Sequence, residues 1–408
     1  MNELVIDRLG AQGDGVANSN EGSVFVPFTL QGETVSVSGA GKRRDLEAIV
    51  SPSPSRIEPL CVHFGKCGGC QLQHMEQSAY LEWKRDLVKS ALQSENISIE
   101  VDPVRTFENG KRRRAVFSAR QTNEGMVLGY LERNSHTMIA VKECPVLLPE
   151  IVQAIEPIKQ MVSGLLPAND TSHVSVLACD NGLDVAVECE KSPSNQQRQT
   201  VIRRFMETNF CRLSVNGEVL IEQKPPLLTF GKTKIAPAPG GFVQAIKLAE
   251  TAMSEMVISH LARCKKTADL FCGSGTFALN LAEFSTVIAL ESEASAIAAL
   301  ELAWRNSAGK LRTINAEKRD LSRRPLTAAE MKKIDGVVFD PPRAGAEMQV
   351  KQLAKSKVKK IAAVSCSPTT LARDLRILIN GGYKLLSVTP LDQFAYTPHI
   401  EVVALLER

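Results

Sequence analysis

A cysteine in the C-terminal part of the chain has the sequence setting of a nucleophile. The strand candidate IAAVS at residues 361–365 runs into SCSP at residues 365–368, which contains Cys366, and a helix is expected to follow. Ligands of open α/β sheets lie outside the carboxyl ends of the strands. A helix N-terminus lowers the pKa of a thiol beside it, so Cys366 is a candidate for covalent catalysis, although a lone cysteine is more often a small core residue.

A glycine loop and two carboxylates are predicted to lie at the same edge of the sheet. The sequence DLFCGSGTF at residues 269–277 ends a strand, and Gly273 and Gly275 let the chain turn closely around a ligand. Glu291 ends the next strand, where a carboxylate can accept both hydroxyls of a ribose, and Asp340 ends another. Together these residues indicate an adenosine-containing cofactor. The lack of a third glycine in register argues against NAD, and a strand-to-helix turn without a ligand is the alternative.

The elements that position these residues belong to the last of three predicted domains. The chain has 408 residues, of which 44% are hydrophobic and 23% charged, which is enough for several cores and too long for one ordinary domain. Strands and helices alternate over residues 236–408, which predicts βαβ units and a mostly parallel sheet. Residues 1–55 are predicted to form a small β-barrel, and residues 57–235 a mixed α+β central domain.

Composition narrows the expected compartment and partners. No apolar run approaches the ~18 residues that a membrane helix needs, and the first ten residues carry charges where a signal peptide would be apolar. We therefore expect a cytosolic protein that binds no membrane, with a monomer as the default state. In such a compartment the ten cysteines are not expected to form disulfides, so a cluster among them indicates metal binding or catalysis.

Four of the cysteines have the spacing of a metal site. Cys61, Cys67 and Cys70 form a C-x5-C-x2-C pattern, and Cys144 is followed by a proline, as in the bacterial ferredoxin sequence. Four thiolates could hold an iron–sulfur cluster or a zinc ion, although structural zinc sites favour two C-x2-C pairs and only one is present. The spacing alone leaves both metals open.

Basic residues are concentrated at residues 105–120. This segment contains six Lys or Arg residues and one acid, whereas the whole chain has a net charge of only +4. A local positive stripe is typical of a site for a polyanion such as a nucleic acid. A solvated charged face is the alternative interpretation.

Taken together, these motifs resemble the uracil-5 RNA methyltransferases, S-adenosyl-L-methionine-dependent enzymes that form 5-methyluridine in ribosomal or transfer RNA. DLFCGSG, DPPRAG, SCSP and the terminal TPHIEV occur in the order and at the spacing of that family. The ribosomal members with an N-terminal TRAM domain and an iron–sulfur cluster are the most similar. The resemblance implies a TRAM-like or OB-like barrel, a central RNA-binding domain whose four cysteines hold a [4Fe–4S] cluster, and a C-terminal class I Rossmann-like methyltransferase domain.

The resemblance also implies roles for individual residues. Cys366 would add to C6 of uracil, and Glu401, in HIEV, would be the base that removes the proton from C5. The residues expected around the cofactor are Gln244, Phe271, Gly273, Gly275, Thr276, Glu291 and Asp340. The family commonly continues Gln-x-Asn, whereas this chain has Ile246 two residues after Gln244, so no role is carried over to that position.

The expected substrate is RNA, with 23S rRNA favoured over transfer RNA because the cluster and the TRAM domain accompany the ribosomal members. The residues expected to contact its backbone are Lys111, Arg112, Arg113 and Arg114. The target base must leave its stack, because a thiol cannot approach C6 within a paired helix. A cytosine-5 RNA methyltransferase would carry a second cysteine in a Pro-Cys motif where this chain has Pro-Pro-Arg, and an N-methyltransferase would need no cysteine. A non-enzymatic RNA-binding assembly factor would not need the complete set of site residues.

Overall fold

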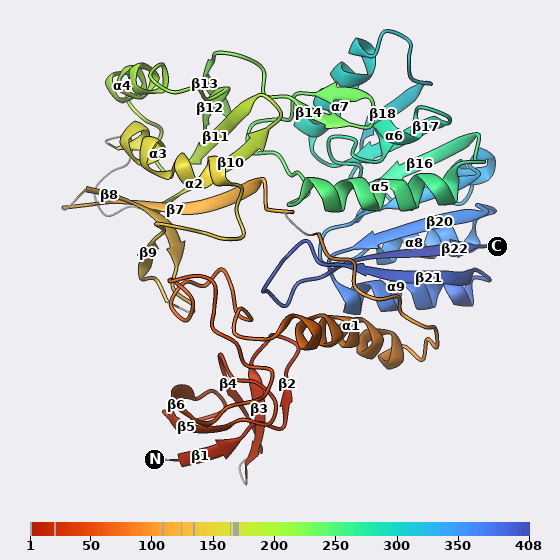
Figure 1. Ribbon diagram of the computed structural model, residues 1–408. Coiled ribbons are helices and arrows are strands. Elements are labelled where there is room, and N and C mark those ends of the chain that lie inside the picture. The colour runs from red at the N-terminus through yellow and green to blue at the C-terminus, as the bar shows by residue number, and fades with distance from the viewer. Residues whose placement is uncertain are drawn as a thin grey trace.

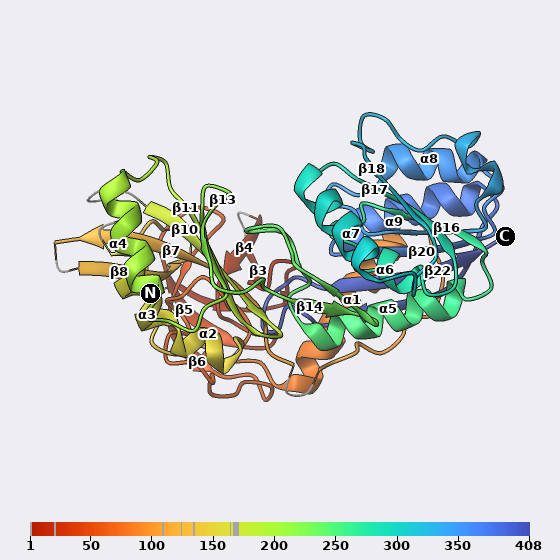
Figure 2. The same ribbon diagram turned by 90° about the horizontal axis from the view of Figure 1, so that it is seen from above.

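The chain folds into a small N-terminal β domain, a central domain and a C-terminal α/β domain. The computed structural model describes residues 2–19, 22–107, 110–123, 125–133, 135–163, 165 and 171–408, which include all of the individually named candidate residues. Figure 1 shows the three parts, and Figure 2 shows the central and C-terminal domains lying next to each other. None of the described helices is long and apolar enough to cross a membrane.

The N-terminal domain is all-β, but its described strands do not close into the single predicted barrel. They form two three-stranded antiparallel sheets, ordered β1-β5-β6 and β2-β3-β4, around a small core that includes Ile6, Val26 and Val35. A bridge between Phe25 and Arg43 links the two sheets, in place of a continuous ladder. The strands are β1 (Asn2–Val5), β2 (Arg8–Leu9), β3 (Gly15–Ser19), β4 (Gly22–Val26), β5 (Thr34–Ser38) and β6 (Asp45–Ser51).

The central domain is built on a seven-stranded sheet ordered β13-β12-β11-β10-β7-β8-β9. Its helices bury apolar side chains against the sheet, for example Ile158 and Phe205 against Phe117 and Val174. The strands are β7 (Arg114–Thr122), β8 (Gly125–Leu131), β9 (Met138–Ala140), β10 (Thr171–Cys179), β11 (Gly182–Glu188), β12 (Arg212–Val215) and β13 (Glu218–Glu222). The helices are α2 (Pro149–Gln153), α3 (Ile155–Val162) and α4 (Asn195–Phe205).

The C-terminal domain contains the predicted parallel sheet. Its strand order is β18-β17-β16-β19-β20-β22-β21, with β22 antiparallel to both of its neighbours and the other pairs parallel. The central strands are apolar on both faces, as in β19, where all four residues are buried, because helices cover the sheet. The strands are β16 (Lys266–Leu270), β17 (Thr286–Glu291), β18 (Ile314–Lys318), β19 (Gly336–Phe339), β20 (Lys360–Ser365), β21 (Lys384–Leu391) and β22 (Glu401–Glu407).

The helices of this domain follow the strands in the βαβ pattern. They are α5 (Lys247–Leu261), α6 (Ala278–Leu281), α7 (Ala294–Asn306), α8 (Glu347–Lys355) and α9 (Pro368–Asn380), with a 3-10 turn η1 (Glu330–Lys333). A two-stranded hairpin of β14 (Leu228–Phe230) and β15 (Thr233–Ile235) precedes them.

Helix α1 (Gln77–Ser94) lies far from the C-terminal domain in sequence but packs on it. Its buried residues recur at helical spacing, and Val88, Ala91 and Leu92 join the core that contains Leu371 of α9. Figure 1 shows α1 directly beneath α9. The sequence placed this helix within residues 57–235, yet its apolar face belongs to the core of the C-terminal domain.

The same face of α1 carries a completely buried lysine. The ammonium group of Lys84 lies 2.5 Å from Oδ1 of Asp392 and also donates to the carbonyl oxygens of Phe394 and His399, at 3.2 and 2.7 Å. Tyr80 donates to the other oxygen of Asp392 at 2.8 Å. Burial lowers the pKa of Lys84, and the charge of Asp392 opposes this effect. The pair therefore ties α1 to the loop between β21 and β22.

We predict that Lys84→Met lowers the thermal unfolding midpoint substantially. The substitution leaves the Asp392 carboxylate buried without its counter-charge, and removing one partner of a buried pair typically costs about 3 to 5 kcal/mol. Lys89→Met on the same helix is the control, because Lys89 is only half-buried and pairs with the exposed carboxylates of Glu82 and Asp86. Equal midpoint shifts in the two variants, measured by differential scanning fluorimetry, would contradict this role of Lys84.

Candidate active site

Strand pairing brings Cys366 and Glu401 together although 34 positions separate them in the sequence. Ser365 at the end of β20 pairs with Val402 in the antiparallel strand β22. Cys366 directly follows Ser365, and Glu401 directly precedes Val402 in the antiparallel strand. The thiol and the carboxyl group are therefore neighbours at the carboxyl end of β20. Both residues were predicted as a catalytic pair, and the register of this ladder is what makes them neighbours.

The thiol of Cys366 is a weaker acid than the sequence suggested. The position before α9 was expected to lower its pKa, but burial together with the charges of Glu401 and Asp340 raises the pKa of Cys366 to about 11. The exposed guanidinium of Arg343 acts in the opposite direction. Arg343 is held nearby by His399, whose Nε2 lies 3.1 Å from its NH2. Ionisation of Cys366 therefore depends on its burial and on the charges of its neighbours more than on the helix.

A chain of hydrogen bonds connects Glu401 to Asp340 through two buried glutamines. Nε2 of Gln393 donates to Oε2 of Glu401 at 2.7 Å and to Oε1 of Gln244 at 2.9 Å. Nε2 of Gln244 in turn donates to Oδ2 of Asp340 at 2.9 Å. The two carboxyl groups are thus linked side chain by side chain across the ends of β19 and β22.

Sequence reasoning did not identify Gln393. It lies in the loop between β21 and β22, eight residues before Glu401, and it has no exposed surface. Its position beside Asp392, directly after an apolar strand, is the only sequence signal, and polar pairs of this kind are common in loops. Arg343, within the DPPRAG motif, was likewise not singled out.

Burial makes the carboxylates of Asp340 and Glu401 stronger proton acceptors than ordinary carboxylates. It raises the pKa of Asp340 to about 7, and it raises the pKa of Glu401 well above its ordinary value, with the charge of Asp340 adding to the effect. The bond from Gln393 opposes the shift at Glu401. Oε1 of Glu401 is buried and has no hydrogen-bond partner in the described part of the chain. This oxygen is therefore free to receive a proton from a bound ligand.

The glycine loop and Glu291 lie together at the ends of β16 and β17. Gly273 donates its N–H to Oε2 of Glu291 at 3.0 Å, and the N–H groups of Ser292 and Glu293 reach the other oxygen at 2.6 and 3.0 Å. Phe271 adopts a left-handed conformation with φ of 62°, which turns the chain sharply at the strand end.

The two glycines of this loop serve different purposes. A Cβ at Gly275 would lie 2.5 Å from Cδ1 of Leu300, so Gly275 allows the loop to pack on α7. A Cβ at Gly273 would meet open space, so its backbone faces a region that a ligand can enter. Thr276 is half-buried in the same loop and accepts a bond from Asn280 through its carbonyl oxygen.

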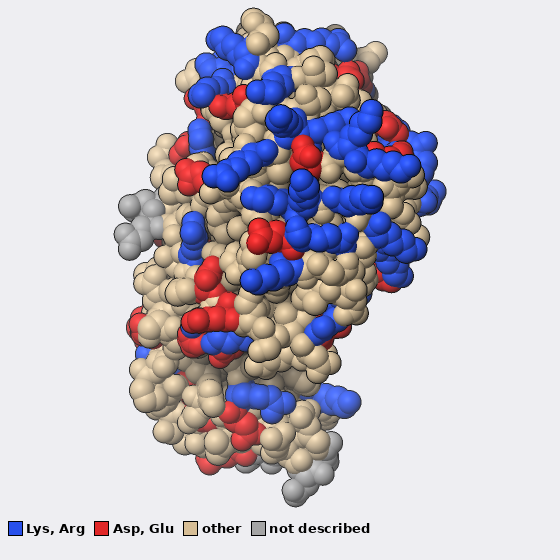
Figure 3. Space-filling view, turned by 90° about the vertical axis from the view of Figure 1, so that its right-hand side faces the viewer, with Lys and Arg blue, Asp and Glu red and all other residues tan. Residues whose placement is uncertain are grey.

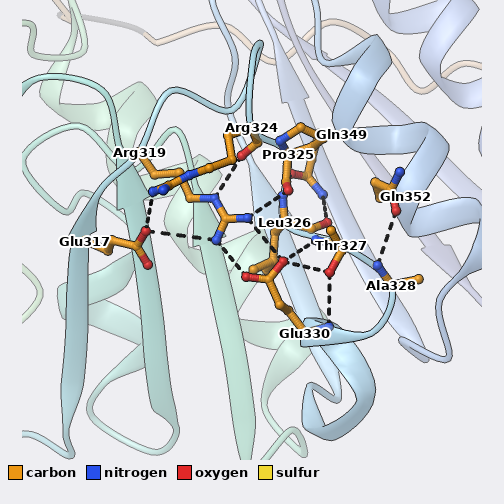
Figure 4. Close-up of polar contacts among 10 residues, drawn as sticks. All are labelled: Glu317, Arg319, Arg324, Pro325, Leu326, Thr327, Ala328, Glu330, Gln349 and Gln352. Carbon is orange, nitrogen blue, oxygen red and sulfur yellow. Dashed lines mark hydrogen bonds and ion pairs between the residues drawn. The ribbon is translucent and has the colours of Figure 1, made fainter.

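A polar network fixes the loop that follows β18 (Figure 4). The backbone N–H of Arg319 donates to the carbonyl of Glu291 at 2.7 Å, and its guanidinium binds both oxygens of Glu330 at 2.8 and 3.1 Å. The side chain of Gln349 in α8 accepts the backbone N–H of Leu326 at 2.8 Å and donates to the carbonyl oxygen of Leu326 at 3.0 Å. These bonds give the end of β17 a rigid neighbour.

The four candidate metal ligands line one cavity, together with His63, Gln73, Arg112 and Tyr130. The N–H of Gly69 lies 3.4 Å from Sγ of Cys67, a geometry that stabilises a thiolate. Burial raises the pKa of the Cys70 thiol to about 12, with the other three cysteines adding to the shift. No group of three or more His, Cys, Asp or Glu residues in the described part of the chain is arranged so that it could hold a metal ion. The four cysteines therefore share the lining of a cavity without forming a metal site in this structure.

The structure corrects one of the four predicted RNA contacts. Arg113 is 3% exposed, its NH2 lies 2.5 Å from Oε2 of Glu250 on α5, and its Nε donates to the carbonyl of Gln244 at 3.1 Å. It therefore holds the central and C-terminal domains together and cannot reach a phosphate. Lys111 is exposed, Arg112 is half-buried at the cysteine cavity, and the guanidinium of Arg114 lies 5.9 Å from the ring of exposed Phe242.

Comparisons with known proteins agree with this geometry. The family described as tRNA (Uracil-5-)-methyltransferase matches residues 239–408. An uncharacterized RNA methyltransferase of Agrobacterium fabrum is 47% identical and covers 99% of both chains. The 23S rRNA (uracil(1939)-C(5))-methyltransferase of Halomonas elongata is 32% identical, and the similarity spans 100% of this chain and 89% of that enzyme.

A solved structure is similar over the whole chain as well. The tRNA (uracil-54, C5)-methyltransferase of Pyrococcus abyssi, in complex with S-adenosyl-L-homocysteine, has 25% sequence identity, a TM-score of 0.76 and 99% coverage of both chains. Its bound product agrees with the cofactor that the glycine loop and Glu291 indicate. The chain therefore belongs to the RNA uracil-5 methyltransferase family and is an S-adenosyl-L-methionine-dependent RNA (uracil-5-)-methyltransferase.

Proposed function

We propose that this methyltransferase modifies a uridine of 23S rRNA, with transfer RNA as the alternative substrate. The 32% identity with the Halomonas elongata ribosomal enzyme over the full chain supports the ribosomal target. The cavity lined by four cysteines adds support, because the sequence most resembles the ribosomal members that carry a cluster. In this proposal residues 1–55 and 57–235 hold the RNA and residues 236–408 carry out methyl transfer.

The neighbouring positions of Cys366 and Glu401 carry the proposed reaction. The Sγ thiolate of Cys366 forms a bond to C6 of uracil, and the C5–C6 π electrons move toward the O4 carbonyl to give an enolate. The bound cofactor would supply the methyl group on a positively charged sulfonium, and C5 would take up that methyl group as its bond to sulfur breaks. Glu401 then accepts the C5 proton, the electrons of that bond restore the C5–C6 double bond, and the bond between Sγ and C6 breaks.

The electrostatics of the site fit these proton movements. Glu401 has a raised pKa, so once ionised it is a stronger base than an ordinary carboxylate, and its Oε1 has no partner in the described residues. Gln393 occupies the other oxygen and fixes the plane of the carboxyl group. Gln244, Phe271, Gly273, Gly275, Thr276, Glu291 and Asp340 would hold the cofactor, in which a positive sulfonium suits the carboxyl of Asp340.

We also propose that Cys61, Cys67, Cys70 and Cys144 bind a [4Fe–4S] cluster. The four cysteines line a shared cavity, and structural zinc sites favour two C-x2-C pairs, of which this sequence has one. The cavity is also lined by Gln244 and Phe394, so the group would support the segments that carry the reaction.

Substituting each of the two proposed catalytic residues separates their roles and also tests which RNA is the substrate. Glu401→Gln can still attack uracil and transfer the methyl group but cannot remove the proton, so we expect it to remain covalently joined to RNA. Cys366→Ser and the double variant should form no adduct, because a hydroxyl is far less ionised than a thiol. Incubation of each variant with 23S rRNA or with bulk transfer RNA, both from cells that lack the gene, followed by denaturing electrophoresis, detects the adduct.

The RNA that is trapped identifies the substrate. A slow-migrating band with 23S rRNA alone supports the ribosomal proposal, and a band with transfer RNA alone overturns it. Normal turnover by Glu401→Gln would show that the base is another group. A band that persists without Cys366 would show that the nucleophile is another group.

Removing the donor at Gln393 should move the pH dependence of the reaction. Its bond lowers the pKa of Glu401, and a hydrogen bond to a charged group contributes about 1.5 to 3 kcal/mol, so Gln393→Leu should shift the acid limb of the kcat profile upward by about one to two pH units. Gln349→Leu is the control, since Gln349 is equally buried but binds the backbone of Leu326. A fall in kcat without any shift of the profile would contradict the link between Gln393 and Glu401.

The metal proposal can be tested with the absorption spectrum. Anaerobically purified protein should be brown with four irons per chain, and Cys70→Ser should lose the visible absorption band and the iron. Cys189→Ser in the same domain should keep both, because Cys189 does not line the cavity. Colourless wild-type protein that contains one zinc per chain would refute the cluster.

A further inference from the structure

The methyltransferase domain has a second basic surface, on the side opposite the active site. Figure 3, which views the right-hand side of Figure 1, shows Lys and Arg side chains gathered over the upper and middle part of this face, with few acids among them. We call this surface the basic edge. Its exposed residues are Arg263, Lys265, Lys310, Arg312, Lys332, Lys333, Lys355, Lys357, Lys359 and Lys384.

The sheet topology places these residues side by side. Lys265 directly precedes β16, Lys333 precedes β19, and Lys359 precedes β20, and these three parallel strands are neighbours. Lys384 starts β21, in register with Glu407 of β22, which pairs with Lys360. The basic edge is thus the amino-terminal edge of the sheet, joined by the carboxyl ends of helices such as α8, which ends at Lys355.

These cations are not neutralised by the protein. None of the ten forms an ion pair with an acidic side chain in the described part of the chain, whereas Lys89, Lys351 and Arg305 elsewhere on the surface do. Asp335 lies within the edge, but its carboxylate accepts the backbone N–H groups of Lys265 and Lys266 at 3.0 and 3.1 Å. The positive charge of the edge is therefore available to a partner.

The basic edge cannot be part of the catalytic pocket. Cys366 and Asp340 follow the carboxyl ends of β20 and β19, and a strand of about six residues at ~3.3 Å per residue separates them from this edge by ~20 Å. Seven strands at spacings of ~4.8 Å make the edge ~29 Å wide. Its width suits an extended polyanion better than a single phosphate group.

We propose that the basic edge binds the phosphate backbone of a double-helical part of the substrate RNA, away from the target uridine. Single-stranded RNA is usually held by aromatic side chains that stack on its bases. The exposed aromatic residues of the described chain are Phe25 and Phe242, and both lie outside this edge. Helical RNA, in contrast, is recognised through its backbone, for which unpaired Lys and Arg side chains suffice. The proposal rests on the RNA methyltransferase activity and adds a second point of contact to it.

The test compares two triple variants of the full-length protein that carry equal changes of net charge. Lys265→Gln, Lys333→Gln and Lys359→Gln together neutralise three adjacent strand starts, and none of these side chains forms a hydrogen bond in the described structure. Arg305→Gln, Arg323→Gln and Lys351→Gln together are the control, because these exposed residues of the same domain are each ion-paired with a neighbouring acid, Glu301, Asp320 or Glu347. Binding of a labelled RNA duplex is measured by fluorescence anisotropy over a series of salt concentrations.

For the edge variant we expect the negative slope of log K against log salt to become shallower by about two to three, since each lost phosphate contact contributes ~0.7 to 0.9. The control variant should keep the wild-type slope. Adduct formation with a short single-stranded RNA that contains the target uridine should be unchanged in both variants, which separates this proposal from the reaction itself. Equal slopes in wild type and edge variant, equal losses in both variants, or an equal loss with single-stranded RNA would each overturn it.

Discussion

A buried ion pair between Lys84 and Asp392 holds the part of the structure on which the active site depends. Asp392 begins the loop between β21 and β22, and the ammonium of Lys84 also binds the carbonyl of Phe394, two residues further on, and that of His399 near the far end of the loop. Tyr80 adds a further bond, because its hydroxyl oxygen accepts the backbone N–H of Tyr396 at 2.8 Å. The loop leads directly into Glu401, so a side chain from α1 fixes the position of the backbone at the proposed base.

The site that results places several acidic groups in a small buried volume. The charge of Asp340 raises the pKa of Glu401, and the charges of both raise the pKa of Cys366. Such a site is unfavourable while its members are charged, and the two glutamines reduce the cost by donating to the carboxylates without adding charge. A positively charged methyl donor is the natural complement of this arrangement. The negative field that hinders ionisation of the free thiol would favour binding of that donor.

The sequence predicted those parts of the molecule that depend on local pattern. The position of Cys366, the glycine loop and the parallel sheet follow from motifs at strand ends, because a strand, its turn and the next helix are encoded within a few residues. Properties set by distant partners were missed. The pKa of Cys366 depends on Glu401, the burial of Arg113 depends on Glu250, and the role of Gln393 depends on Gln244, in each case a residue from another element.

The packing of α1 also means that domain order in space differs from domain order in the chain. In the sequence, the central sheet from β7 to β13 is inserted between α1 and the C-terminal elements on which α1 packs. During synthesis α1 emerges well before β21 and β22, so its lysine must wait for an aspartate made some 300 residues later. Contacts of such high sequence separation form late and slow folding. A fragment limited to the C-terminal region would carry both proposed catalytic side chains, Cys366 and Glu401, and still lack the helix that holds the loop before Glu401.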